Sequence, residues 1–223
     1  MIVSGDLTQR ARERQFKRAR RWLDGLPAPW LAVPGNHDIP LFDLVRRVLF
    51  PRHRYRRLIT PDLTPLRTLP GVRVLGIDSS RRKTTGLLTP ERLEAIAELG
   101  AGREDDLRVL VTHHPLMDRQ VEGYQEALAA AAAARVDVLL AGHQHLSWHR
   151  RITQDPGLGM LQVQSGTTTS FRRRKKEPHN TFNVLRWNGG VLEVELDTWR
   201  DGTYVPGDAR RFRRGEQGWD ALD

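Results

Sequence analysis

The sequence contains no cysteine in its 223 residues, and this absence limits the chemistry open to the protein. Disulfide bonds and thiolate metal ligands are excluded. Any metal ion must therefore be held by histidine, aspartate, glutamate, asparagine or water, donors that suit hard or borderline cations.

Long apolar runs are also lacking. No stretch approaches the roughly 20 apolar residues that a transmembrane helix needs, and no charged-then-apolar leader is visible at the start of the chain. No amphipathic helix of the membrane-surface type is evident either. We therefore expect a cytoplasmic protein without a membrane span.

Lysine is scarce, because only four of the 36 basic residues are lysine and the others are arginine. The formal net charge of +9 indicates either a solvated basic surface or a field that attracts an anionic substrate. The run RRRKK at residues 172–176 raises nucleic acid as a partner. Aromatic residues are not interleaved with this run as a base-stacking surface requires, so we do not favour that partner.

Four short apolar runs end abruptly in polar or histidine-rich residues. The runs at 31–33, 72–77, 107–111 and 138–141 lead into PGNHD, DSS, THHP and GHQH. Because they are continuously apolar, they predict strands covered on both faces. Helices are expected at 9–26 after a Thr8 cap, from 90 after Thr89, and at 121–135. This alternation predicts an α/β fold with ligands beyond the carboxyl ends of the strands.

The pattern changes to strands after Gly159. Runs at 160–163, 181–187 and 191–199 predict a second sheet, with the hairpin turn NGG between the last two. We expect one domain over 1–199. Residues 200–223 are expected to form a polar tail, loosely packed apart from three aromatic side chains, Tyr204, Phe212 and Trp219.

Chemically useful side chains collect at the predicted strand ends. Asp6, Asn36, the pair His113 and His114, and the pair His143 and His145 all follow apolar runs. His143 and His145 are alternate residues leaving a strand, so both imidazoles can face one site. Together these donors suit Zn, Mn or Fe.

The order GD, GNHD, HHP and GHxH resembles the calcineurin-like metallophosphoesterases, and the resemblance extends to about residue 199. The segments SGDLT, VPGNHD, GLLTPERL and SGTTTSFRRR are most similar to bacterial class III cyclic-nucleotide phosphodiesterase-like proteins. The resemblance implies a two-sheet β-sandwich flanked by helices and two divalent or trivalent metal ions, Mn, Fe or Zn. It also implies hydrolysis of small phosphodiesters, cyclic nucleotides first, by in-line attack of an activated water.

The resemblance further implies roles for individual residues. Asp6 would bridge both metals, Asn36, His113 and His143 would complete one of them, and His145 would bind the other. His37 would be catalytic, stabilising developing charge and protonating the leaving oxygen. No metal role is implied for three further residues, His114, Asp38 and Asp78, and the last two are expected to be structural.

The family's Asp-x-His block, expected at the end of its first strand, does not occur in this sequence. We therefore expect the family's first strand and helix, roughly 30 residues, to be missing from the chain as given. Two alternatives remain for the function. One is a catalytically impaired metal-binding protein, and the other is a nuclease or another phosphoesterase of the same superfamily, with a lipid-headgroup pyrophosphatase less favoured.

Overall fold

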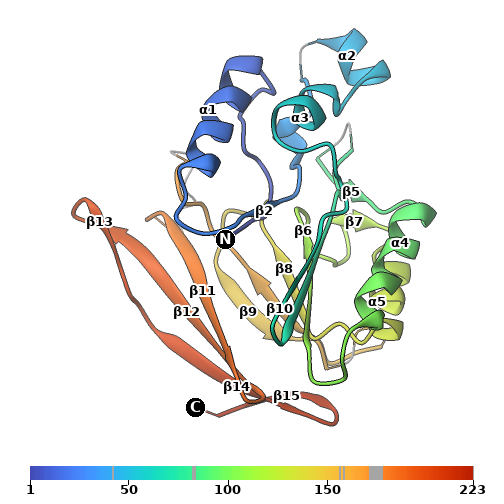
Figure 1. Ribbon diagram of the computed structural model, residues 1–223, viewed down its shortest axis with the longest axis vertical. Helices are drawn as coiled ribbons and strands as arrows, with labels where there is room; N and C mark the ends of the chain where they lie inside the picture. Colours follow the sequence, from blue (N-terminus) through green and yellow to red (C-terminus); the bar gives the residue numbers. More distant parts are fainter. Residues whose placement is uncertain (42, 82–83, 156, 158, 171–177, 223) are drawn as a thin grey trace.

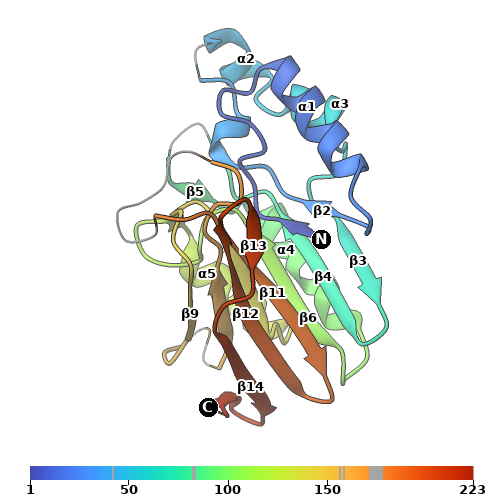
Figure 2. The same ribbon diagram turned by 90° about the vertical axis from the view of Figure 1, so that its left-hand side faces the viewer.

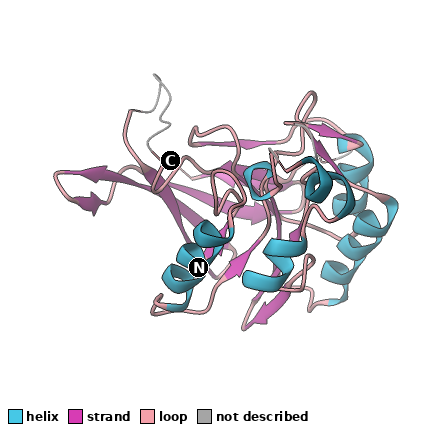
Figure 3. Cartoon of the chain, turned by 90° about the horizontal axis from the view of Figure 1, so that it is seen from above, coloured by secondary structure: helices cyan, strands magenta, loops and turns pink. Residues whose placement is uncertain are grey.

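Two β-sheets packed face to face form the centre of the molecule (Figure 1). The structure is a computed structural model that describes all residues except 42, 82–83, 156, 158, 171–177 and 223. Helices α4 (Pro90–Ile96) and α5 (Tyr124–Ala133) cover the face of the first sheet that points away from the second (Figures 1 and 3). The expected α/β fold with two sheets and flanking helices is confirmed.

The first sheet has the strand order β3-β4-β6-β8-β10-β9. Strands β4, β6, β8 and β10 run parallel, and β3 and β9 pair antiparallel at the two edges. The bounds are β3 Leu66–Leu69, β4 Val72–Ile77, β6 Leu107–Thr112, β8 Val138–Ala141, β9 Trp148–Arg151 and β10 Leu161–Gln164. The parallel centre explains why β4, β6 and β8 are mostly apolar, because both faces of these strands are covered.

The second sheet is antiparallel and has the order β11-β12-β14-β15, with β13 also pairing to β12. Its bounds are β11 Thr181–Asn188, β12 Val191–Arg200, β13 Thr203–Val205, β14 Ala209–Gly215 and β15 Gly218–Ala221. Gly189 and Gly190 have φ of 54° and 84° in the β11-β12 turn, as a tight hairpin of this type requires.

Three apolar clusters hold the layers together. Leu75, Ile77 and Leu110 face α4 and α5, whereas Val74 and Val109 face the second sheet. The third cluster lies between α1 (Glu13–Asp24) and α3 (His53–Leu58), where Phe16, Leu23 and Tyr55 are buried. Adjacent residues of one strand therefore serve two different cores, as the alternation of side chains in a strand requires.

The remaining elements are short. They are β1 Ile2–Val3, β2 Leu31–Ala32, the 3₁₀ turn η1 Asn36–Asp38, α2 Leu44–Leu49, β5 Gly86–Leu87, η2 Ala97–Ala101 and β7 Val121–Glu122. Strands β1 and β2 pair in parallel as a separate sheet, and so do β5 and β7. Helices α1, α2 and α3 gather at one end of the sheets (Figures 1 and 2). Among the described residues, no helix has the length and apolarity needed to cross a membrane.

Three sequence predictions need correction. Helix α1 begins at Glu13, because Ala11 has a φ of 48° and the Thr8 hydroxyl donates to the His37 carbonyl instead of capping the helix. Strand β10 belongs to the first sheet, where it pairs with β8. The expected loose tail is instead part of the second sheet, since β13 and β14 pair with β12 and β15 pairs with β14.

Candidate metal centre

The site is built from loops that leave the carboxyl ends of strands. Asp6 follows β1, Asn36 opens η1 after β2, His113 follows β6 and His143 follows β8. Asp6, His143 and His145 adopt the left-handed backbone conformation, with φ of 56°, 71° and 55°. Such values are uncommon outside glycine, and they turn the chain out of the strand direction after β1 and β8.

Four of the predicted side chains meet at one point. The Asn36 Oδ1 atom lies 3.1 Å from His113 Nε2 and 3.0 Å from His143 Nδ1. The two imidazole nitrogens are 3.3 Å apart. Asp6 Oδ1 lies 3.4 Å from His113 Nε2. The structure thus brings Asp6, Asn36, His113 and His143 together from segments up to 137 positions apart.

The hydrogen bond made by the Nδ1 atom of His113 indicates which ring nitrogen is free to bind a metal ion. His113 Nδ1 donates to the Ser4 carbonyl at 2.7 Å, so in the neutral ring Nε2 carries a lone pair. Nε2 then faces the amide oxygen of Asn36 and the carboxylate of Asp6, which are acceptors as well. Acceptors that converge in this way need a cation or a proton between them. A histidine whose second nitrogen is bonded to a backbone carbonyl is the usual arrangement of a metal ligand.

The spacing of the atoms also fits a metal ion. Two donors that each lie about 2.1 Å from one ion are about 3.0–3.4 Å apart when the angle at the ion is near 90–109°. The four separations of 3.0, 3.1, 3.3 and 3.4 Å fall within this range. The donor set of one carboxylate, one amide and two imidazoles suits Zn, Mn or Fe.

The electrostatics favour the neutral, ligating form of His143. Burial lowers its pKa to about 4, with His113 contributing next in the same direction and Asp6 opposing. His145 and His37 act on the same pKa, which shows that both imidazoles lie within electrostatic reach of His143. An imidazole with this pKa keeps a free lone pair at neutral pH.

His114 lies close to the centre, but both of its ring nitrogens are bonded to other residues. Ring nitrogens of His113, His114 and His143 lie within 4.8 Å of one another. However, His114 Nδ1 accepts from the Ser79 hydroxyl at 3.0 Å, and Nε2 donates to the Thr84 carbonyl at 3.0 Å. Burial, and next the charge of His113, lower the pKa of His114 to about 2. We therefore read His114 as a neutral packing residue that holds its loop.

A profile of the family described as calcineurin-like phosphoesterases matches residues 1–147, a range that includes every residue of the centre. The chain belongs to this family. Membership places it among the hydrolases of phosphoric esters.

Individual relatives are more distant. A probable cyclic nucleotide phosphodiesterase of a Synechococcus species is 25% identical over 215 residues, covering 89% of this chain and 78% of the relative. A purple acid phosphatase from yellow lupin (Lupinus luteus) seeds has a TM-score of 0.65 at 13% identity, covering 93% of this chain and 45% of its own. The chain therefore spans less than half of the lupin enzyme, and this likeness supports the fold. A Vps29 double mutant from Entamoeba histolytica has a TM-score of 0.47 at 16% identity, covering 95% of this chain and 81% of its own.

Asp38 organises the loop of this phosphoesterase that carries Asn36 and His37. Its buried carboxylate accepts hydrogen bonds from the backbone nitrogens of Leu7, Thr8 and Gly35 at 3.1, 2.8 and 2.9 Å. Burial, and next the charge of Asp6, raise the pKa of Asp38 to about 7, while the hydrogen bonds work in the opposite direction. Asp38 thus ties the loop after β1 to the loop after β2, which agrees with a structural role.

Other supporting contacts of the phosphoesterase site have no signature in the sequence. The carbonyls of Ser4, Gln9 and Thr84 each orient an imidazole, and any residue type could provide them. The buried Asp78 accepts hydrogen bonds from Arg52 and Arg92. The basic run at 172–176 lies outside the described residues.

Gly35 must remain small for the centre of this phosphoesterase to form. A methyl group at this position would collide with the backbone nitrogen and the carboxylate of Asp6. We expect Gly35→Ala to lower the free energy of unfolding by about 1–3 kcal/mol and to reduce bound metal. Thermal unfolding and elemental analysis measure both effects. Gly100→Ala is the control, since its methyl group would meet Ala134 at an ordinary 3.6 Å, and equal behaviour of the two variants would contradict the steric argument.

Proposed function

We propose that the protein is a phosphodiesterase that holds two divalent or trivalent metal ions and hydrolyses cyclic nucleotides. The observation that carries this proposal is the convergence of acceptor atoms from Asp6, Asn36, His113 and His143 on one point. The cyclic-nucleotide substrate is supported by the name of the Synechococcus relative. A cytoplasmic location, where nucleotide substrates are formed, belongs to the same proposal.

The proposal assigns each residue of the centre a role. Asn36, His113 and His143 would hold one ion, Asp6 would bridge both ions, and His145 would hold the second. When bound, such ions polarise a phosphoryl oxygen and lower the pKa of a water molecule. The Asp6 carboxylate supplies the negative charge of this donor set, so its loss should affect cation binding most.

His37 is the residue of this chain that we assign to proton transfer. Its Nδ1 donates to the Gln9 carbonyl at 2.9 Å, so Nε2 is the nitrogen that gains and releases a proton. Its backbone N–H donates to Asp6 Oδ1 at 3.0 Å, which keeps the His37 loop against the centre. From there Nε2–H would stabilise charge on the ester and protonate the leaving oxygen.

Two alanine variants separate these roles. His143→Ala should lower the metal content measured by elemental analysis. His37→Ala should keep its metal but lose turnover of 3′,5′-cyclic AMP and of bis-p-nitrophenyl phosphate by about 10²-fold or more, because it removes the general acid. Equal loss of metal in both variants would contradict the division of roles. Turnover of bis-p-nitrophenyl phosphate without any turnover of cyclic nucleotides would keep the phosphodiesterase and reject the proposed substrate.

A further inference from the structure

Apolar side chains are concentrated on the surface around helix α2. Of the thirteen large apolar residues that are exposed in the described chain, six lie between residues 41 and 50. These residues are between 45% and 69% exposed, namely Leu41, Leu44, Val45, Val48, Leu49 and Phe50. We call the region formed by these residues and helix α3 the α2–α3 surface. It is the outermost part of one end of the molecule (Figures 1 and 2).

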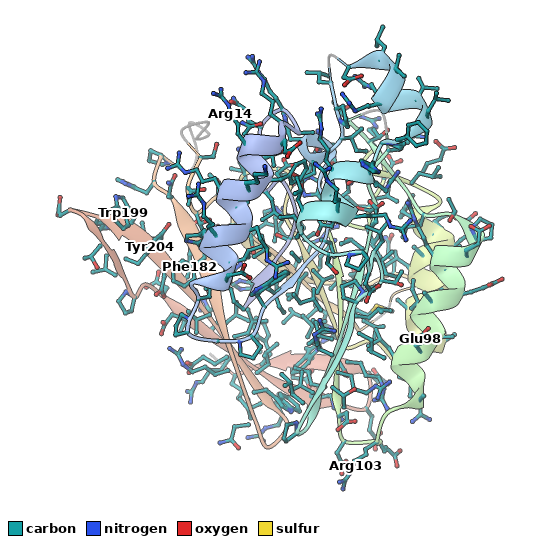
Figure 4. The ribbon with its side chains drawn as sticks, turned by 45° about the horizontal axis from the view of Figure 1, so that its top comes forward. Arg14, Glu98, Arg103, Phe182, Trp199 and Tyr204 are labelled. Atoms are coloured by element: carbon teal, nitrogen blue, oxygen red, sulfur yellow. The ribbon has the colours of Figure 1, made fainter. Side chains whose placement is uncertain are left out.

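Helix α2 has no apolar contact layer within the described chain. None of its residues is buried, and the helix is held mainly by the Asp43 cap, whose carboxylate accepts from Arg46 N at 3.1 Å. A second exposed apolar group is different, because its aromatic rings pack on one another (Figure 4). Tyr204 lies 4.7 Å from Phe182 and 5.1 Å from Trp199, measured between ring centroids. Exposed aliphatic clusters of the α2 kind usually mark a binding surface.

The α2–α3 surface is also positively charged. Six arginines and one aspartate occur between residues 41 and 58. Four of the arginines pair with three acidic residues. Arg46 and Arg54 pair with Asp43, Arg52 pairs with Asp78, and Arg57 pairs with Glu13. Even with these three acids counted, positive charge is in excess by three. The surface therefore combines exposed aliphatic side chains with a basic field.

An open cavity of about 580 Å³ lies beside the aliphatic side chains. Its lining includes Leu49 and Phe50 together with His53, Arg56 and Arg57 of α3. The cavity thus offers cationic groups directly next to the exposed hydrocarbon. An amphiphile with an anionic head and an apolar tail matches both features at once.

We propose that the α2–α3 surface docks the protein on an anionic lipid surface. The aliphatic side chains enter the boundary between headgroups and acyl chains, and the arginines contact lipid phosphates. A second copy of the chain fits less well, because its identical surface would bring the same positive charge into the interface. A nucleic acid also fits less well, since five of these six exposed side chains are aliphatic and only Phe50 offers a ring on which a base can stack.

Docking in this way would bring the metal centre close to the lipid. Arg52, the residue before α3, bonds to Asp78 and to the Ser80 carbonyl, and both residues lie in the segment that follows β4. The α2–α3 surface is thereby anchored at the same end of the first sheet as the centre. The site would then sample substrates close to the lipid surface as well as dissolved ones.

Vesicle co-sedimentation of the full chain tests the proposal. We expect binding to phosphatidylcholine vesicles containing about 30% phosphatidylglycerol, and loss of most of it at about 1 M salt, where the Debye length is ~3 Å. Val45→Ser/Leu49→Ser should weaken binding about tenfold or more, and Arg56→Gln about fivefold. Leu69→Ser/Val205→Ser, which changes exposed apolar residues elsewhere, should bind like the wild type.

Other outcomes would overturn the proposal. Failure to sediment with anionic vesicles, or equal sedimentation with pure phosphatidylcholine, would reject an anionic lipid surface. A wild-type dimer in size-exclusion chromatography that becomes a monomer in Val45→Ser/Leu49→Ser would assign the surface to a second copy. Binding of single-stranded RNA that Arg56→Gln weakens, without vesicle binding, would assign it to nucleic acid. Turnover of bis-p-nitrophenyl phosphate in free solution is read separately, so failure of docking leaves the proposed catalysis untouched.

Discussion

Asp6→Asn is expected to lower turnover of bis-p-nitrophenyl phosphate by about 10³-fold or more. The negative charge of this carboxylate would hold the metal cations, and their stabilisation of the transition state is worth about 4 kcal/mol for such a loss. The backbone should tolerate the change, since asparagine also adopts the left-handed conformation that Asp6 has at φ 56°. An asparagine oxygen can still accept from His37 N, so the loop contact survives. The variant therefore removes the negative charge of Asp6 while leaving the fold intact.

The measurements are turnover with added Mn or Zn, bound metal by elemental analysis and the melting temperature. Asp24→Asn is the control, because this exposed aspartate pairs with Arg20 on the surface of α1 and is not one of the four converging side chains. An Asp6→Asn variant that keeps its metal and more than about a tenth of its turnover would exclude a central role for this carboxylate.

Asp78→Asn is expected to produce the largest loss of stability. Asp78 is only 1% exposed, and its carboxylate accepts from Arg52, Arg92 and the backbone nitrogen of Ser80. Removing its charge leaves two guanidinium groups without their shared anion, which costs about 3–5 kcal/mol for a buried pair. For a chain of this size the melting temperature should fall by about 6–20 °C.

Thermal and urea unfolding would measure this loss. The exposed Arg20–Asp24 pair provides the comparison, since a surface ion pair contributes roughly 0–1 kcal/mol and Asp24→Asn should change stability little. If the two variants unfolded at the same temperature, the Arg52–Asp78–Arg92 contacts would have no net effect on stability. Bound metal in Asp78→Asn should stay near the wild-type level below the melting transition, because the Asp78 carboxylate bonds to Arg52, Arg92 and Ser80 and not to the four converging side chains in the described structure.

The central strands β4, β6 and β8 of the first sheet could be predicted from the sequence because they are largely buried on both faces, whereas the exposed edge strands β3 and β9 were not predicted. The runs 72–77 and 138–141 match β4 and β8 residue for residue. Apart from Arg73, the residues of these two runs are not polar, and the polar segments after the runs mark where each strand ends. The assignment of β10 to the second sheet was wrong because an apolar run shows that a strand exists but not which strand it pairs with.

The missed elements are those whose side chains contribute little to a core. Helix α2 is six residues long and buries none of them, so it has no helical periodicity to detect. Strand β14 reads ARRFRRG and buries only Phe212, which led to the expectation of a loose tail. In both cases the structure depends on neighbouring elements rather than on the local pattern.

In the candidate site, too, some features could be predicted from the sequence and others could not. Asp6, Asn36, His113 and His143 could be named from the sequence because their residue types are unusual directly after apolar runs. The contacts that orient them could not be, since the Ser4 and Gln9 carbonyls belong to the backbone. The sequence alone also does not show which of the adjacent His113 and His114 belongs to the site. Only the structure shows that the ring nitrogens of His114 are bonded to Ser79 and Thr84.

The left-handed backbone at Asp6, His143 and His145 has a consequence for directed evolution of this enzyme. This conformation costs an ordinary residue about 1–2 kcal/mol, whereas glycine adopts it freely. A library screened for heat resistance alone should therefore accumulate glycine at these three positions. Its variants would unfold at higher temperature but would lack the side chains proposed to bind metal. A screen that also requires turnover should retain the side chains and collect its stabilising substitutions in parts of the fold that are not strained.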